Sequence, residues 1–349
     1  MFKIIGWDIG AANIKAAFVA FEKEIEVRSV VASQPYEIWR EKHRLTEVLE
    51  SVSSAVCADG LPQAMAVTMT AELSDIFATK REGVLYVLES VEVSFPGCSN
   101  FALSLSGEFL SLGEAKYRPL DFAATNWLAS ARWFALKYPD CLIVDVGSTT
   151  TDVIPILDGQ VAASGRSDTA RLQSGELVFT GVLRTNAAAI VQSVPLNGKF
   201  CPVASEYFVN SGDVHLILGN LTAEDYGCST PDGRPASMAA ARGRLARLVC
   251  ADADMLSLAE IEEMALYIHK RQIRQIMLGM ERVISRLPRL KNHPVIVLGA
   301  GAFMAEEASK KLGMEVADLD KDFSRQKLAV APCLAAAHLL AKHLSVRSL

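Results

Sequence analysis

The same short pattern occurs twice in this chain, once near its amino terminus and once near its middle. An apolar run ends in Asp-Ile-Gly at Asp8 and is followed by a second apolar run from Asn13 to Phe21. Another ends in Asp-Val-Gly at Asp145 and is followed by an apolar run from Thr151 to Ile156. Runs of this length with a glycine between them predict two strands joined by a tight turn. A strand hairpin that occurs twice in one chain predicts a duplicated α/β fold.

The length of the chain agrees with two copies, because 349 residues exceed what one hydrophobic core commonly holds. We expect a first domain of residues 1–138 plus 327–349 and a second of residues 139–326, with an insertion at about 164–254. The apolar stretch from Val84 to Leu105 is expected to be rich in strands. Helical spacing of apolar residues predicts helices at 36–57, 119–138, 258–287, 303–312 and 332–344.

Charge and composition exclude several classes of protein. The formal net charge is −5, so the chain has no general attraction to nucleic acid or anionic lipid. Hydrophobic residues make up 50% of the chain, which is typical of a folded protein. The longest apolar run, Leu328 to Ala341, is too short to span a bilayer and predicts a buried helix. The 7 cysteines lack C-x-x-C spacing and the opening residues lack a secretory h-region, so we expect a cytoplasmic protein.

The two Asp-x-Gly turns suit phosphate and metal chemistry. Glycine lets the backbone approach a phosphate closely, and successive N–H groups of a tight turn form a concavity that binds anions. A carboxylate beside such a turn can hold a hydrated Mg²⁺ that bridges to the phosphate. We therefore predict that Asp8 and Asp145 are metal ligands. The predicted phosphate-binding residues are Gly10, Ala11, Asn13, Lys15, Gly147, Ser148, Thr149, Thr150, Gly299 and Gly301.

Each of these features also has a plainer interpretation. A glycine in such a turn can serve only to close the hairpin, and the aspartate only to cap it. Gly299-Ala-Gly301 lies between an apolar strand and a helix, but it lacks the third glycine of a dinucleotide-binding fingerprint. A Rossmann dehydrogenase is therefore disfavoured. Asp213 and His215 are two potential metal ligands, which are too few for a separate metal site.

Longer motifs carry a resemblance to known families. The order DIGAANIK, DVGSTTTD, VLGAGAF resembles the phosphate-1, phosphate-2 and adenosine motifs of the superfamily that contains actin, sugar kinases and the heat-shock chaperone ATPase. Within it, the chain is similar to the hydantoinase/oxoprolinase family, in the short-chain branch linked to tetrahydromethanopterin-dependent one-carbon metabolism. The strings that carry this similarity are TMTAELSD (68–75), GEFLSLGEA (107–115), AATNWLASA (123–131), RLQSGELVFTGVLRT (171–185) and LTAEDYGCSTPDGR (221–234).

The resemblance implies a fold and an activity. The fold would be two RNase H-like, actin-like ATPase domains around a central cleft. The activity would be that of a transferase of methanofuran-type cofactor biosynthesis. Such an enzyme condenses a tyramine- or tyrosine-derived phenol with an aminomethyl-furanmethanol diphosphate and releases diphosphate. The expected partners are these small molecules, with Mg²⁺ as cofactor, no nucleic acid and no membrane. ATP binding and a homodimer are both left open.

Further site residues follow from the same resemblance. Glu72 is expected to be the catalytic base, because an acidic residue in the equivalent connecting segment acts as base in related phosphohydrolases. Asp152 is the reserve candidate for this role. Arg171 and Arg184 are expected to hold an anionic group of the substrate. The plainer alternatives are a helix-start acid for Glu72 and surface salt bridges for the arginines.

Two other functions compete with the aryl-ether transferase. One is an ATP-dependent small-molecule kinase or hydantoinase-like amidohydrolase of the same fold. The other is a non-catalytic regulator that binds nucleotide without turnover. Binding of ATP measured against binding of inorganic diphosphate separates the transferase from both.

Overall fold

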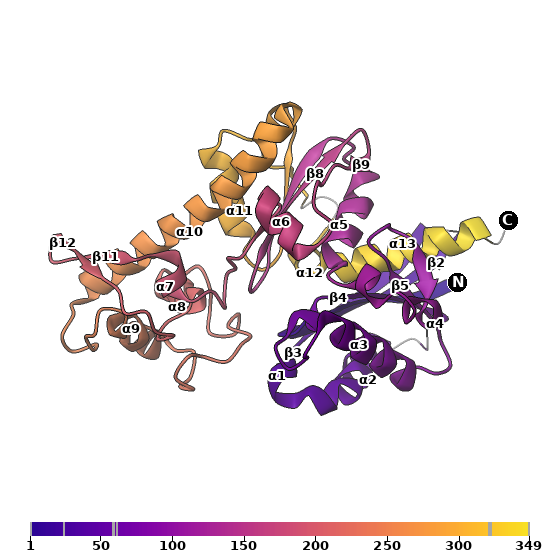
Figure 1. Cartoon of the computed structure of the whole chain (residues 1–349), viewed down its shortest axis with the longest axis horizontal. Coiled ribbons are helices and arrows are strands. Elements are labelled where there is room, and N and C mark those ends of the chain that lie inside the picture. The colour runs from indigo at the N-terminus through magenta and orange to yellow at the C-terminus, as the bar shows by residue number, and fades with distance from the viewer. Residues whose placement is uncertain (1, 24, 58–59, 61, 320–322, 348–349) are drawn as a thin grey trace. The chain divides into compact units, whose positions relative to one another are not determined.

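The computed structural model describes residues 2–23, 25–57, 60, 62–319 and 323–347 (Figure 1). The chain forms two compact units. Unit 1 comprises Met1–Cys141, Ile154–Ala170 and Asp318–Leu349, and unit 2 comprises Leu142–Val153 and Arg171–Ala317. Both contain strands and helices, so the predicted α/β class is confirmed. The domain boundaries expected from the repeat stay a prediction.

Unit 1 is built on a six-stranded sheet with the order β3-β2-β1-β4-β5-β6. The first three strands form an antiparallel meander that contains the predicted hairpin, and β4 lies parallel to both β1 and β5. In the register of β1 with β4, Asp8 pairs with Thr68. The strands are β1 (Phe2–Ile9), β2 (Asn13–Glu22), β3 (Ile25–Pro35), β4 (Ala64–Met69), β5 (Ser99–Leu103) and β6 (Phe109–Ser111).

Helices cover both faces of this sheet because side chains alternate along its strands. Ile5, Trp7 and Ile9 pack in one core with α2 and α3, whereas Ile4 and Ala66 pack in another with α5 and α13. The helices of unit 1 are α1 (Ile38–Glu41), η1 (Lys42–Arg44), α2 (Leu45–Val56), η2 (Ala71–Leu73), α3 (Lys80–Ser94), α4 (Leu112–Ala115), η3 (Pro119–Phe122), α5 (Asn126–Ala135), α12 (Arg325–Ala329) and α13 (Ala331–Arg347).

The expectation of strands over residues 84–105 is wrong for most of that stretch. Residues 80–94 form α3, and only β5 is extended. Two local signals favour the helix. The Thr79 side chain caps it by accepting a hydrogen bond from the Glu82 N–H, and the buried residues Val84, Val87, Leu88 and Val91 recur with helical spacing. Periodicity therefore outweighed the strand propensity of the valines.

The second sheet has the order β10-β8-β7-β13, and β9 pairs with β8. Its strands are β7 (Cys141–Val146), β8 (Thr151–Leu157), β9 (Gln160–Val161), β10 (Leu177–Val178) and β13 (Val295–Leu298). A separate hairpin joins β11 (Ser193–Leu196) to β12 (Lys199–Pro202). The accompanying helices are α6 (Asp168–Ser174), α7 (Ala187–Ile190), α8 (Ser211–Ile217), α9 (Met238–Arg247), α10 (Leu258–Arg286), η4 (Pro288–Asn292) and α11 (Ala302–Lys311).

The apolar run near the end of the chain is a buried helix, as predicted. It lies mostly in α13, which packs on β1, β2 and β4 through Cys333, Leu334, Ala336 and Ala337. Among the described residues, no helix is both long and apolar enough to cross a bilayer.

The contact between α13 and β1 depends on Gly6. A Cβ atom at Gly6 would lie 1.8 Å from the Cys333 carbonyl oxygen, so the helix would have to move off the sheet. Gly6→Ala should therefore lower the free energy of unfolding by about 3 kcal/mol or more. Gly113→Ala is the control, because this exposed helical glycine has no neighbour within 4 Å and alanine there should be neutral or stabilising by up to about 1 kcal/mol. Equal urea midpoints for the two variants would contradict this account.

Candidate functional site

The two Asp-x-Gly turns close with the same hydrogen bond. The Gly10 N–H donates to the Asn13 carbonyl at 3.0 Å, and the Gly147 N–H donates to the Thr150 carbonyl at 2.9 Å. Each glycine thereby turns the chain back into the following strand, β2 in one case and β8 in the other. The sequence repeat is therefore a repeat of backbone structure.

In the turn after β7, backbone carbonyl groups accept hydrogen bonds from another segment of the chain. Peptide N–H groups of residues 182–184 donate to the carbonyls of Gly147 and Ser148 at distances of 2.9 to 3.0 Å. In the described part of the chain, no acceptor meets the peptide N–H groups of residues 148–150. Successive N–H groups without protein acceptors form a concavity for an anion such as a phosphate.

The turn after β1 is arranged in a similar way. The carbonyls of Ala11 and Ala12 accept hydrogen bonds from the N–H groups of Ile38 and Tyr36, both at 3.0 Å. The N–H groups of Ala11 and Ala12 themselves meet no acceptor among the residues described. This turn therefore also presents backbone donors for an anion.

Charged and hydroxyl groups surround this first turn. Asp8 is 5% exposed, and its carboxylate lies 3.9 Å from the Lys15 ammonium. Thr70 directly follows β4; its N–H donates to the Ile9 carbonyl at 3.0 Å, and its hydroxyl lies 3.4 Å from where a Cβ on Gly10 would be. Our sequence analysis missed Thr70. Thr70 could have been predicted from its position directly after β4, a strand that pairs in parallel with β1.

Gly299 and Gly301 bring the β13–α11 turn against Asp145. Gly299 has a φ of +84°, and a Cβ there would lie 2.4 Å from Asp145 Oδ1. A Cβ on Gly301 would lie 2.4 Å from a Val146 methyl carbon, and the Gly301 N–H donates to the Val146 carbonyl at 2.9 Å. The structure thus places these predicted glycines beside the second turn, where they support the aspartate.

The buried side-chain amide of Gln272 holds the segment that packs against the second turn. Gln272 of α10 is fully buried and donates to the Thr180 hydroxyl at 2.9 Å and to the Gly181 carbonyl at 2.8 Å. Its own carbonyl pairs with His215 at 3.1 Å, and burial lowers the pKa of His215 to about 3, so this imidazole is neutral. Gly181 packs directly on the backbone of residues 148–149. Sequence analysis missed Gln272, because its position in a long helix carries no local signal.

Glu72 lies in η2, immediately after β4, and is 1% exposed. Neither carboxylate oxygen completes a hydrogen bond within the described residues. Burial raises the pKa of Glu72 to about 7; nearby peptide N–H groups and the Lys80 ammonium oppose this shift, and the Asp168 carboxylate adds to it. Lys80 is itself paired with Asp168. A carboxylate that titrates near neutral pH can act as a proton acceptor.

Asp152 and Arg171 form an ion pair inside unit 2. Arg171 is 1% exposed, its Nη2 lies 2.9 Å from Asp152 Oδ1, and it also donates to the Glu176 carbonyl at 3.0 Å. Arg184 is half-buried, and its N–H donates to the Ser148 carbonyl. The two predicted arginines therefore differ: Arg171 is engaged by its own unit, and Arg184 borders the turn.

The donor atoms at the turns fit Mg²⁺. Among the described residues, no three His, Cys, Asp or Glu side chains gather as a complete metal site. Mg²⁺, however, commonly takes one or two carboxylates and completes its shell with water and phosphate oxygens. Asp8 and Asp145, each beside a turn whose peptide N–H groups meet no acceptor among the described residues, are carboxylates of this kind. Asp213, by contrast, is paired with Arg244 at 2.5 Å and accepts from Tyr226.

The strand orders and the two units define an α/β protein in which one strand–turn–strand structure occurs twice. The hydantoinase/oxoprolinase family model matches residues 63–343, and the chain belongs to this family. Its fold resembles nucleotide-free acetone carboxylase, with a TM-score of 0.59 and 10% identity over 96% of this chain and 70% of that one.

Two relatives share the name (4-{4-[2-(gamma-L-glutamylamino)ethyl]phenoxymethyl}furan-2-yl)methanamine synthase. The protein of Methanocaldococcus jannaschii is 34% identical over 343 residues, which are 98% of both chains. The protein of Methanococcus vannielii is 36% identical over 173 residues, which are 50% of this chain and 76% of the relative. The similarity to the first therefore extends over both units.

The crowding at Asp145 can be tested with a matched pair of glycines. Gly299 and Gly313 both have positive φ, so alanine costs about 1–2 kcal/mol of backbone strain at either position. Only at Gly299 would the new Cβ also displace Asp145, since Gly313 has no neighbour within 4 Å. We expect Gly299→Ala to weaken diphosphate binding in the presence of Mg²⁺ at least about tenfold relative to Gly313→Ala, measured by calorimetry. Equal affinities would show that the crowding is irrelevant to the site.

The buried Glu72 carboxyl should make stability depend on pH. The unfolded chain releases this proton near 4.5, whereas the folded chain keeps it up to about 7. The contribution of Glu72 to the free energy of unfolding should therefore be largest below about pH 4.5. It should fall by roughly 3 kcal/mol as the pH rises from about 4.5 to 7. Glu72→Gln should abolish this part of the slope in urea unfolding at several pH values. Asp75→Asn, on the same segment, should retain it; a wild-type slope in Glu72→Gln would refute the assignment.

Proposed function

We propose that this protein is an enzyme that joins a phenol to a furanylmethyl carbon through an aryl ether bond and releases diphosphate. The observation that carries the proposal is the 34% identity to the Methanocaldococcus jannaschii synthase over 98% of both chains. That relative's name describes a product in which a phenoxymethyl ether links an aromatic ring to a furan. The anion concavities of the two turns support a substrate that carries phosphate groups.

The proposed reaction is a substitution at carbon. The phenol oxygen forms a bond to the furanylmethyl carbon, while the bond from that carbon to the diphosphate oxygen breaks. The diphosphate leaves with the electron pair, and the phenol proton passes to a base. The phenol is derived from tyramine or tyrosine, and the furan carries an aminomethyl group.

The turns would stabilise the leaving group. In the proposal, the N–H groups of residues 148–150 and of Ala11 and Ala12 bind diphosphate oxygens, and Lys15 adds a positive charge. Asp8 and Asp145 would hold Mg²⁺, which supplies neutralisation of the charge that develops on diphosphate. Fixed donors directed at developing charge are commonly the largest contribution of a site to catalysis.

Glu72 is the proposed base. An unperturbed phenol has a pKa near 10, and a carboxylate near 4 is a poor acceptor for its proton. The raised pKa of Glu72, about 7, reduces this gap and leaves much of the group ionised at neutral pH. The ion pair of Asp152 with Arg171 makes Asp152 the weaker candidate, because a paired carboxylate is less basic. Arg184 is kept as the proposed contact to an anionic group of the substrate.

An ATP-dependent enzyme is the second candidate. Its support is the fold shared with acetone carboxylase, an enzyme of ATP-dependent acetone carboxylation, and the glycine pair between β13 and α11. On this alternative the same turns would bind the phosphates of a nucleotide. The two candidates differ in whether diphosphate or ADP is released.

The test is an assay with a furanmethanol diphosphate, Mg²⁺ and either tyramine, tyrosine or γ-glutamyltyramine, read by mass spectrometry and diphosphate release. An ether adduct formed without ATP supports the proposal, and ADP with no adduct supports the alternative. Glu72→Gln should lower kcat by about 10²- to 10⁴-fold with diphosphate affinity nearly unchanged. Asp75→Asn should leave kcat within about twofold. An unchanged kcat in Glu72→Gln would remove Glu72 from the mechanism.

A further inference from the structure

Unit 1 contains an open cavity that is lined by none of the candidate site residues described above. Its volume is about 620 Å³, which is within the usual range for sites that bind small molecules. The walls come from three parts of the sequence: residues 105–136, residues 159–166 and the end of α13. All of these belong to unit 1. The cavity is therefore formed within one compact unit.

The charge of this cavity is its unusual property. Arg132, Arg166 and Lys342 line it, and no aspartate or glutamate is among the lining residues. No salt bridge joins any of these three cations to a carboxylate within the described residues. The whole chain has a net charge of −5, so this local positive excess runs against its overall balance. Cations that converge on a cavity and pair with no carboxylate of the protein attract an anionic ligand.

Arg132 is held in position by the turn between β5 and β6. Its Nη1 donates to the Ser106 carbonyl at 3.3 Å. Its guanidinium lies so close to Gly107, which has a φ of +84°, that any Cβ there would overlap it. Gly107 therefore provides both the turn and the space for the guanidinium. The Arg132 side chain is otherwise exposed, so the donors other than Nη1 can bind a carboxylate.

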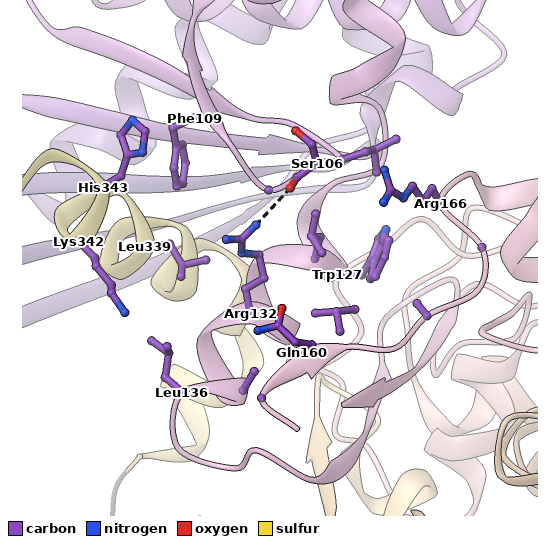
Figure 2. A pocket seen from close by; sticks show the side chains of 18 of the residues that line it. Ser106, Phe109, Trp127, Arg132, Leu136, Gln160, Arg166, Leu339, Lys342 and His343 are labelled. Carbon is purple, nitrogen blue, oxygen red and sulfur yellow. Dashed lines mark hydrogen bonds between the residues drawn. The ribbon is translucent and has the colours of Figure 1, made fainter. Parts of the chain in front are cut away.

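The distribution of the cations indicates the shape of the ligand. Figure 2 shows Arg132 near the middle of the labelled side chains, with Trp127 and Arg166 on one side and Leu339 and Lys342 on the other. Apolar surface thus alternates with positive charge, and neutral polar groups of Ser106 and Gln160 lie among them. A compact diphosphate needs donors that meet at one point. Separated cations suit anionic groups that are spaced along a body.

We propose that this cavity binds an extended polycarboxylate, a small molecule with two or more carboxylates separated by methylene or amide groups. Arg132 binds one carboxylate as a bidentate partner, and Arg166 and Lys342 bind others. The aliphatic parts of the ligand contact Leu339 and Trp127, and its amides pair with Gln160 and Ser106. The site is separate from the two Asp-x-Gly turns and does not depend on the proposed reaction.

Calorimetry with γ-glutamylglutamate as the probe tests the proposal on the unaltered full chain. We expect saturable binding that weakens as salt is added. Arg132→Gln and Arg166→Gln should each weaken it about tenfold, and Lys342→Gln several-fold. Arg81→Gln, an exposed arginine of unit 1 on α3 and outside the cavity, is the matched control and should bind like the unaltered protein. Circular dichroism of each variant separates lost binding from lost folding.

Three results would overturn the proposal. The first is no binding of the probe to the unaltered protein at millimolar concentration. The second is equal weakening by Arg81→Gln, or none by Lys342→Gln, whose side chain is exposed and dispensable for folding. The third is displacement of the probe by inorganic diphosphate, which would make the cavity a phosphate site. Because the readout is binding, failure of the aryl-ether assay would leave these outcomes unaffected.

Discussion

A single backbone hydrogen bond, from a glycine N–H to the carbonyl three residues later, is the constraint on which the rest of the site depends. It closes the turn at Gly10 and again at Gly147. Once each turn is closed, N–H groups from other segments donate to its carbonyls, and the remaining N–H groups of the turn meet no acceptor among the described residues. In our proposal these remaining N–H groups bind an anion. Thr70, Gln272 and the glycines at 299 and 301 are then explained as parts that hold the turns in this state. Every one of them lies within contact of a turn or of the loop that supports it.

The protein buries a carboxyl group, that of Glu72, which is costly to ionise. Because Glu72 is fully buried, its carboxyl group stays protonated up to about pH 7. Ionising it in the folded state lowers the free energy of unfolding at neutral pH. Residues with shifted pKa values that lower stability are common at functional sites, where they contribute to reactivity. Gly83 packs tightly against the backbone of Glu72, because a Cβ at Gly83 would lie 2.6 Å from the Glu72 Cα. The segment is thus fixed by packing while its carboxylate is left without a complete hydrogen bond.

Our two proposals give one acidic chain two ways of recognising anions. At the turns, peptide N–H groups meet at one point, which suits the concentrated charge of a diphosphate. In the cavity of unit 1, guanidinium and ammonium groups are spread among apolar side chains, which suits separated carboxylates. The first depends on backbone closure and glycine, the second on the packing of Arg132 over Gly107. Substitutions at one should therefore leave the other largely intact, because the two sets share no residue.

The sequence by itself determined the strands, the two turns and their candidate ligands, because these depend on residues that are adjacent in the chain. Apolar runs ending in Asp-x-Gly made the hairpins predictable, and Gly299 and Gly301 do lie against Asp145 and Val146. Local propensity misjudged residues 84–105, where helical periodicity and the Thr79 cap prevailed. Only the tertiary structure decided that Glu72 is buried, that Arg171 pairs with Asp152, and that Arg132, Arg166 and Lys342 share a cavity. Burial and ion pairing depend on contacts between segments that are far apart in the chain. A local sequence pattern does not predict which distant side chains will form these contacts.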